Sequence, residues 1–254
     1  MPTILIHPRI SYSWRRGKGA TKVFRQAFEP QSSTYTYLIG CDETGEAVLI
    51  DPVRETVERD LALLRERKLT LKFTVETHIH ADHVTGASEL RAATGCLCAV
   101  PAGSGADRAD VAVADGEPII FGKLRLQPLY TPGHTDDHHC YLLDDAAQAR
   151  VFTGDALMID GCGRTDFQGG DAATLYRSVH DKLFTLPDDT LVYPGHDYQQ
   201  RRVSSIGQEK ARNPRLGGGK CVEEFIAIMA ALDLPRPKMI DVAVPANLAC
   251  GAIG

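Results

Sequence analysis

The sequence predicts an α/β fold, because short apolar segments of strand character alternate with amphipathic helical segments along the chain. Hydrophobic residues make up 43% and charged residues 24% of the 254 residues, a balance typical of an ordinary globular protein with a core of useful size. Several apolar segments end at turns that combine glycine or proline with histidine or aspartate. Ligands are held at strand ends in open α/β sheets, so these turns are candidates for a functional site.

The first hundred residues are expected to contain four strands and two helices. The strand segments are rich in apolar and β-branched residues, and the helical segments place apolar residues at a helical spacing among charged ones. Turn residues separate them, and Gly95 is expected to end the second helix. The expected strands cover residues 34–39, 47–50, 71–76 and 96–100, and the expected helices cover residues 54–67 and 84–94.

The rest of the chain continues this alternation. A hairpin is expected about Gly122 and Lys123, and Pro235 and Pro237 are expected to interrupt the last helical stretches. The sequence contains no low-complexity tract and no clear domain boundary. The expected strands cover residues 119–121, 124–129, 140–143, 151–153 and 191–193, and the expected helices cover residues 172–184, 199–211 and 221–232, with a short turn near residue 246.

Charge and cysteine usage argue against several classes of protein. The net charge of -5 disfavours a general nucleic-acid binder, which needs clustered lysine and arginine to neutralise phosphates. No apolar run approaches the roughly 20 residues that span a bilayer, so no membrane association is expected. Seven cysteines without a Cys-x-x-Cys pair indicate reduced thiols and therefore a reducing compartment.

Residues 1–23 are interpreted as a basic N-terminal extension. Arginine and lysine but no acidic residue precede Glu29, a bias that organelle transit peptides share. Pro2, Pro8 and Gly17 would break a long amphipathic helix, however. A bacterial cytoplasmic protein is therefore the preferred interpretation, and a protein of the mitochondrial matrix is the alternative.

The segment Thr77–His83 carries three histidines and an aspartate within six residues. It follows the alternating strand 71–76, so one loop presents several imidazole nitrogens and a carboxylate. Zinc and ferrous iron both favour this mixture of ligands. A lone histidine is more often a surface or hydrogen-bonded core residue, but four ligand-type residues at this spacing indicate a metal site.

Three more ligand-type residues occur in the same context. His134, Asp155 and His196 each follow an apolar strand on a turn with glycine or proline, as His78 follows the strand before it. The alternative is that they are unrelated loop residues. Because the context repeats, we expect the four turns to converge at one edge of the fold and to build a rigid site there.

Together these residues resemble the signature of the metallo-β-lactamase superfamily. The resemblance implies an αβ/βα sandwich of two mixed β-sheets flanked by helices, formed by residues 24–254 as a single catalytic domain. It also implies a two-metal arrangement that makes a metal-bound hydroxide for hydrolysis. In that arrangement one ion binds to His78, His80 and His134, the other binds to Asp82, His83 and His196, and Asp155 bridges them; Asp51 completes the signature.

A closer similarity, from about Phe24 to Gly251, is to the persulfide dioxygenases, also called sulfur dioxygenases. It implies one ferrous ion per chain, held by His78, His134 and Asp155 with open positions for the persulfide and O2. The remaining ligand-type residues, His80, Asp82, His83 and His196, would then surround and orient the ligands. The segments that carry this similarity are Phe24–Pro30, Gly161–Gln168, Tyr193–Tyr198, Asn213–Leu216 and Val244–Asn247.

The resemblance implies a reaction of hydrogen sulfide metabolism, in which glutathione persulfide, O2 and water give sulfite and glutathione. Because glutathione carries two carboxylates, Arg164 and Arg215 are candidate substrate-binding residues, and Tyr198 is a candidate pocket residue. The structural alternatives are a loop-holding salt bridge for Arg164, a helix-end contact for Arg215 and aromatic packing for Tyr198. A homodimer is common in this family and is expected here.

Two other functions are weighed against this one. A hydroxyacylglutathione hydrolase of the glyoxalase II type shares the motif and the glutathione moiety, and it uses two metals. Its family has a longer C-terminal region with basic glutathione contacts, whereas the segment that ends near Val244–Asn247 is short. A non-catalytic metal or persulfide sensor is less favoured because every signature ligand is present, and a nuclease is disfavoured by the acidic charge.

Overall fold

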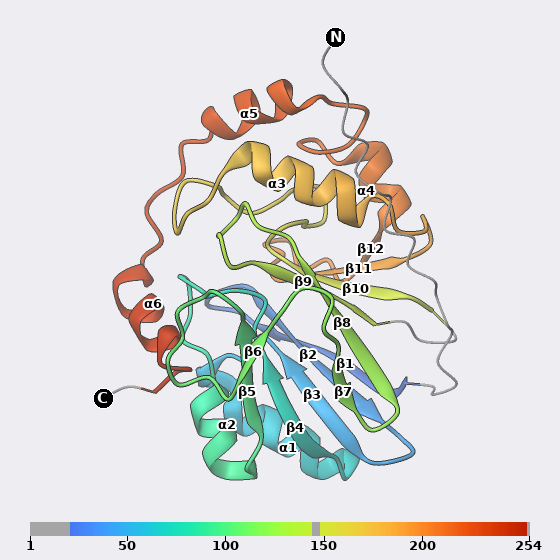
Figure 1. Ribbon diagram of the computed structural model, residues 1–254, viewed down its shortest axis with the longest axis vertical. Coiled ribbons are helices and arrows are strands. Elements are labelled where there is room, and N and C mark those ends of the chain that lie inside the picture. Colours follow the sequence, from blue (N-terminus) through green and yellow to red (C-terminus); the bar gives the residue numbers. More distant parts are fainter. Residues whose placement is uncertain (1–20, 144–147, 253–254) are drawn as a thin grey trace.

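The computed structural model describes residues 21–143 and 148–252, which form two six-stranded β-sheets packed face to face with helices on both outer faces (Figure 1). This architecture confirms the expected αβ/βα sandwich. Most of the basic extension predicted for residues 1–23 lies outside the described residues, and the first strand already begins at Thr21.

The first sheet has the strand order β1-β2-β3-β4-β5-β6. Its first three strands pair antiparallel and the others pair parallel, so the sheet is mixed. The turn Asp42–Gly45 joins β2 to β3, with Gly45 at φ 70°. The strands are β1 (Thr21–Glu29), β2 (Thr34–Cys41), β3 (Glu46–Ile50), β4 (Thr70–Val75), β5 (Leu97–Pro101) and β6 (Val111–Val113).

The second sheet has the order β12-β11-β10-β9-β8-β7. Only β10 and β11 pair parallel, and the expected hairpin joins β7 to β8 through Gly122 and Lys123. The strands are β7 (Ile119–Phe121), β8 (Leu124–Tyr130), β9 (His139–Leu143), β10 (Arg150–Gly154), β11 (Leu191–Pro194) and β12 (Ser204–Ser205).

Two groups of helices cover the sandwich. The helices α1 and α2 lie on the first sheet, whereas α3, α4 and α5 lie on the second and α6 stands apart at the side (Figure 1). A 3-10 turn (Arg54–Thr56) precedes α1, and a π-helical turn (Val179–Leu183) extends α3. The helices are α1 (Val57–Arg67), α2 (Ala87–Thr94), α3 (Ala172–Ser178), α4 (Ile206–Arg212), α5 (Val222–Ala230) and α6 (Ile240–Leu248).

The alternation of side chains in the strands explains why this chain forms three layers of apolar packing. In β2, Tyr37 and Ile39 point into the layer between the sheets, while Leu38 points out against α1 and α2. In β10, Phe152 likewise points inward and Val151 points toward α3 and α5. Strands that are buried on both faces have continuous apolar sequences, and these strands were predicted from that pattern.

Several element boundaries differ from those that the sequence predicts. The second helix begins at Ala87 instead of residue 84, because the amide of Thr85 is held by a side chain from α6. The stretch 199–205 is not helical, because the backbone amides of Gln199 and Arg201 donate to the carboxylate of Asp197. The short turn near residue 246 is part of a nine-residue helix, α6. The strands β1, β6 and β12 were not predicted.

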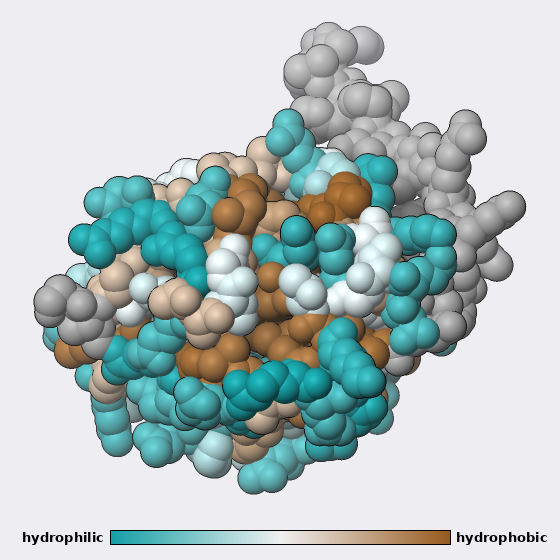
Figure 2. Space-filling model, turned by 90° about the horizontal axis from the view of Figure 1, so that it is seen from below, coloured by the Kyte–Doolittle hydropathy of each residue, from teal (hydrophilic) through white to brown (hydrophobic). Residues whose placement is uncertain are grey.

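Figure 2 shows hydrophilic side chains around the rim of the face seen from below, with hydrophobic ones gathered toward its middle. Helix α1 exposes Glu58, Arg65 and Glu66. No helix among the described residues combines the length and the apolar character that a membrane crossing requires.

Phe152→Ala is expected to destabilise the fold strongly. Its ring is buried between the sheets, with centroids 4.9 Å from Tyr37 and 5.7 Å from Tyr193. Removing it leaves a cavity and should lower the free energy of unfolding by about 3–5 kcal/mol, measured by urea denaturation. Ile120→Ala, at a position that is 53% exposed, is the control and should cost much less. A loss below about 1 kcal/mol for Phe152→Ala would contradict this account of the core.

Candidate metal centre

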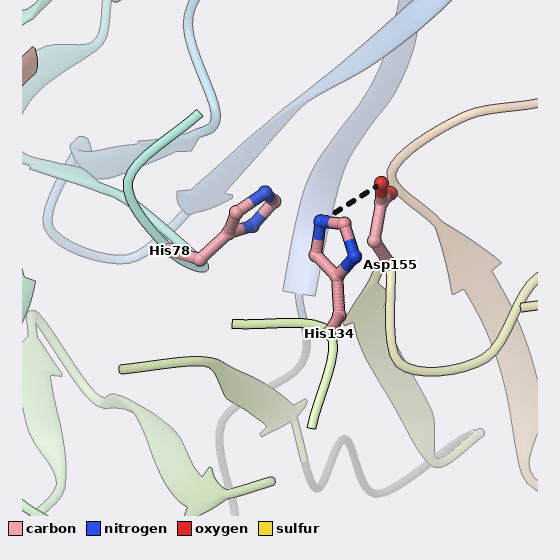
Figure 3. Close-up of side chains that lie close together, drawn as sticks. All are labelled: His78, His134 and Asp155. Carbon is pink, nitrogen blue, oxygen red and sulfur yellow. Dashed lines mark ion pairs between the residues drawn. The ribbon is translucent and has the colours of Figure 1, made fainter. Parts of the chain in front are cut away.

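Three ligand-type side chains meet where the two sheets come together. His78 follows β4 of the first sheet, and His134 and Asp155 follow β8 and β10 of the second. Each offers one ligand atom, and the three atoms lie within 4.8 Å of one another. In Figure 3 the imidazole of His78 faces the other two side chains, and His134 Nε2 lies 3.5 Å from Asp155 Oδ2. The expected convergence of these strand-end turns is therefore present.

The hydrogen bonds around His78 fix which nitrogen can bind a metal. The hydroxyl of Thr77 donates its only proton to Asp51 Oδ2 at 2.9 Å. Its oxygen lies 3.0 Å from His78 Nδ1 and can therefore only accept from that nitrogen, which leaves a lone pair on Nε2. Burial, followed by the neighbouring imidazoles, holds the pKa of His78 well below its usual value, so the ring is neutral as a ligand must be.

His134 and Asp155 are oriented in a similar way. His134 Nδ1 donates to the backbone carbonyl of Arg164 at 2.7 Å, so Nε2 keeps its lone pair on the side of Asp155. The backbone amide of Asp155 donates to His138 Nε2 at 3.1 Å, and His138 Nδ1 in turn lies 3.0 Å from the hydroxyl of Thr131. His138 thus holds the backbone that carries Asp155.

The residues present fit a divalent metal ion. Asp155 Oδ1 is buried and has no hydrogen-bond partner among the described residues, which is costly for a carboxylate oxygen unless a cation satisfies it. Two neutral imidazole nitrogens and one carboxylate are also the ligands that bind ferrous iron in non-haem oxygenases. The arrangement leaves room for further ligands on the side that faces a cavity.

The other four predicted residues form a second group beside this one. His80, Asp82 and His83 offer ligand atoms within 4.8 Å of one another, and His196 Nε2 lies 3.6 Å from Asp155 Oδ1 and 3.7 Å from Asp82 Oδ2. Members of this group also bond directly to one another or to Asp51. His83 Nδ1 lies 2.9 Å from Asp82 Oδ2, and His80 Nε2 lies 3.1 Å from Asp51 Oδ1.

A cavity of about 500 Å3 opens next to the first group. His78, His134 and Asp155 lie on its floor together with Asp82 and His196, and Arg164, Arg215 and Tyr198 line it as well. The rest of its wall is largely apolar, from Ala81, Met158, Phe167, Leu234, Pro235 and Pro237. The three predicted substrate-binding residues therefore all reach the same cavity.

The two arginines are engaged differently. The guanidinium of Arg164 makes a bidentate salt bridge with Asp166 and donates to the backbone carbonyls of Leu234 and Pro235. Arg164 therefore forms the loop-holding salt bridge that was the structural alternative to substrate binding. Direct contact between Arg164 and the substrate stays a prediction. Arg215 donates to the carbonyl of Cys162 at 2.8 Å and pairs with no carboxylate among the described side chains.

Asn213 explains how Arg215 is aimed at the cavity. Its Oδ1 accepts from the amides of Arg215 and Leu216, both at 3.0 Å, and its Nδ2 donates to the carbonyl of Gly161 at 3.0 Å. This side chain therefore ties the turn after α4 to the segment that carries Cys162. Burial raises the pKa of Cys162 to about 11, so its thiol stays protonated at neutral pH.

Sequence reasoning missed the residues that hold the backbone of the metal-binding loop. The amide of Ile79 donates to Asp137 Oδ2 at 3.0 Å, and its carbonyl accepts from Gln168 Nε2 at 2.7 Å. Gln168 ends the segment Gly161–Gln168 that was singled out, so a signal for it was present. Asp137 could not be recognised from the sequence, because aspartate is common in turns and its presence alone does not indicate a role in holding a loop.

Comparisons with known proteins agree with this geometry. The model of the metallo-beta-lactamase superfamily matches residues 30–196. The human mitochondrial persulfide dioxygenase ETHE1 is 51% identical over 244 residues, which cover 96% of this chain and 94% of the human protein. A hydroxyacylglutathione hydrolase from Polaromonas sp. is 42% identical over 172 residues, which cover 66% of this chain and 64% of that protein.

A solved structure extends the match to three dimensions. The crystal structure of ETHE1 from Myxococcus xanthus is 56% identical, has a TM-score of 0.87, and covers 91% of this chain and 100% of its own. Identity of this order over nearly the whole chain, together with the fold and the clustered histidines and aspartates, leads to one assignment. The chain is an enzyme of the persulfide dioxygenase family, within the metallo-β-lactamase superfamily.

Proposed function

We propose that this enzyme oxidises glutathione persulfide with O2 and water to sulfite and glutathione, at a single Fe(II) ion. The observation that carries the proposal is the set of His78, His134 and Asp155, which presents two imidazoles and one carboxylate to the cavity. The name of the human relative, persulfide dioxygenase, supports a reaction of a persulfide with dioxygen.

His78 and His134, each through Nε2, and Asp155 would hold the ion. Bound Fe(II) would supply open positions for the persulfide sulfur and dioxygen and would activate the oxygen. The chain keeps these ligands in place through Thr77, the carbonyl of Arg164 and His138. His80, Asp82, His83 and His196 would act around the ligands, because they already bond to one another and to Asp51.

The cavity has the chemistry that a glutathione persulfide requires. Its apolar wall excludes water from the reacting sulfur, and Arg215 supplies a cationic group for a carboxylate. Tyr198 also lines it, although 77% of that residue is exposed, which suits a contact at the rim. Arg164 holds the wall through Leu234 and Pro235, so it would shape the cavity even without touching the substrate.

The second candidate is a hydroxyacylglutathione hydrolase with two metals. The observations that favour it are the relative of that name from Polaromonas sp. and the second group of His80, Asp82 and His83. It is supported less well, because that relative matches only two thirds of the chain, whereas the persulfide dioxygenases match nearly all of it.

The thiols support a proposal for the compartment. All seven cysteines are free and six of them are buried, which fits a reducing environment. We infer the bacterial cytoplasm, with the mitochondrial matrix as the alternative, since the names of the mammalian relatives include the word mitochondrial. The homodimer stays a prediction.

The test of the function is oxygen uptake by anaerobically purified, iron-loaded protein given glutathione persulfide. We expect rapid uptake with sulfite formed and iron near one atom per chain. The control is the same protein given S-lactoylglutathione, which should not be hydrolysed. No uptake, hydrolysis of the thioester and two metals per chain would instead establish the hydrolase.

Arg215→Ala is expected to raise the KM for glutathione persulfide by roughly tenfold or more, because it removes a charged hydrogen bond worth about 1.5–3 kcal/mol. Iron content and kcat should change little, because Arg215 lies on the wall of the cavity and bonds to none of the three proposed ligands. Steady-state kinetics with metal analysis provide the measurement, and Arg108→Ala, an exposed position, is the matched control. An unchanged KM would remove Arg215 from substrate binding.

Thr77→Val is expected to weaken metal binding by about 10- to 100-fold, as loss of a group that orients a ligand usually does. Valine keeps the shape of threonine but cannot relay the hydrogen bond from His78 to Asp51. Competition with a chelator would measure the affinity. Thr70→Val, at the exposed start of β4, is the control and should match the wild type. If both variants bind metal equally well, the relay does not orient His78.

A further inference from the structure

The helix α6 packs directly on the loop that carries the metal-binding histidines, here called the metal loop (residues 78–85). Ala243 and Ala246 form an apolar cluster with Val84, and their small side chains let the helix come close. Gly251, at φ 81°, continues this approach, because a Cβ there would lie 2.3 Å from the carbonyl oxygen of Thr85. Figure 1 shows α6 at the side of the sandwich, away from α3 and α5.

The side-chain amide of Asn247, near the end of α6, forms three hydrogen bonds with the backbone of this loop. Its Nδ2 donates to the backbone carbonyls of His80 and His83, each at 2.9 Å. Its Oδ1 accepts from the backbone amide of Thr85 at 2.8 Å. The residue is only 3% exposed. Both N–H donors and the acceptor oxygen are thus used, and the reversed orientation of the amide would place its oxygen against two carbonyls.

We propose that Asn247 is a positioning residue for the metal centre, acting through the curvature of the metal loop. His80 and His83 are buried, and Asn247 supplies the donors for both of their carbonyls. This holds the outer side of the loop, while Asp137 and Gln168 hold Ile79 on the other side. A loop held at several positions presents His78 with little freedom left to lose when a metal binds.

This role differs from that of a simple anchor for the C-terminal segment. An anchor would change the stability of the fold but leave metal binding alone, because none of the three bonds of Asn247 reaches a ligand atom. A positioning residue must change the rate at which metal leaves. The inference rests on the proposed ligand set His78, His134 and Asp155, but not on the identity of the substrate.

The experiment measures the release of Fe(II) from holoenzyme to an excess of a coloured ferrous chelator, together with thermal unfolding. Asn247→Asp keeps the size and the acceptor but turns an oxygen toward two carbonyls, and Asn247→Ser keeps a small polar group that cannot span the loop. Both should release iron about 10- to 100-fold faster than the wild type. Val242→Ala, at a position of α6 that is 53% exposed, is the control and should match the wild type.

The outcomes distinguish a positioning role of Asn247 from that of an anchor. Faster release at a temperature well below unfolding supports the positioning role, and the serine variant answers the question if the aspartate variant does not fold. Release at the wild-type rate with a lowered unfolding temperature overturns it and leaves Asn247 as an anchor. Wild-type protein that retains metal but consumes no oxygen would refute the proposed reaction, whereas the release comparison would still stand. Wild-type protein that retains no metal would overturn both.

Discussion

The metal centre depends on how the two sheets are tied together, because His78 follows a strand of the first sheet whereas His134 and Asp155 follow strands of the second. Two buried tyrosines make this tie next to the site. Tyr37 of β2 donates to the carbonyl of Pro194 at 2.5 Å, and Tyr141 of β9 donates to the carbonyl of Glu76 at 2.8 Å. Each bond crosses between the sheets two residues before a histidine of the site, His196 or His78, so the separation of the sheets sets the separation of those histidines.

The two groups of histidines differ in what they are already bonded to. In the first group each imidazole uses one nitrogen on the protein and keeps the other toward Asp155. In the second group His83 bonds to Asp82 and His80 bonds to Asp51, so possible ligands are paired with one another. In this second group His80 Nδ1 and His83 Nε2 are buried without a hydrogen-bond partner among the described residues, so these imidazoles also keep one nitrogen free.

The sequence predicted the fold class and the gathering of the ligand-type residues well, because both follow from strand periodicity and from turns that end strands. The sandwich itself came from resemblance, since periodicity predicts strands without their pairing. The short strands β6 and β12 escaped notice because two or three residues give no period. The contacts of Arg164 with Leu234 and Pro235 and those of Asn247 with the metal loop join segments far apart in the chain, and no local pattern encodes them.

The bonds of Asn247 also bear on the order of events when the protein is made. A nascent chain that has emerged only as far as the second sheet contains His78, His134 and Asp155, yet the carbonyls of His80 and His83 still lack their donor. Those carbonyls gain their donor only once residue 247 has been synthesised and α6 has docked, so the hydrogen bonds of the metal loop are completed by the last helix of the described chain.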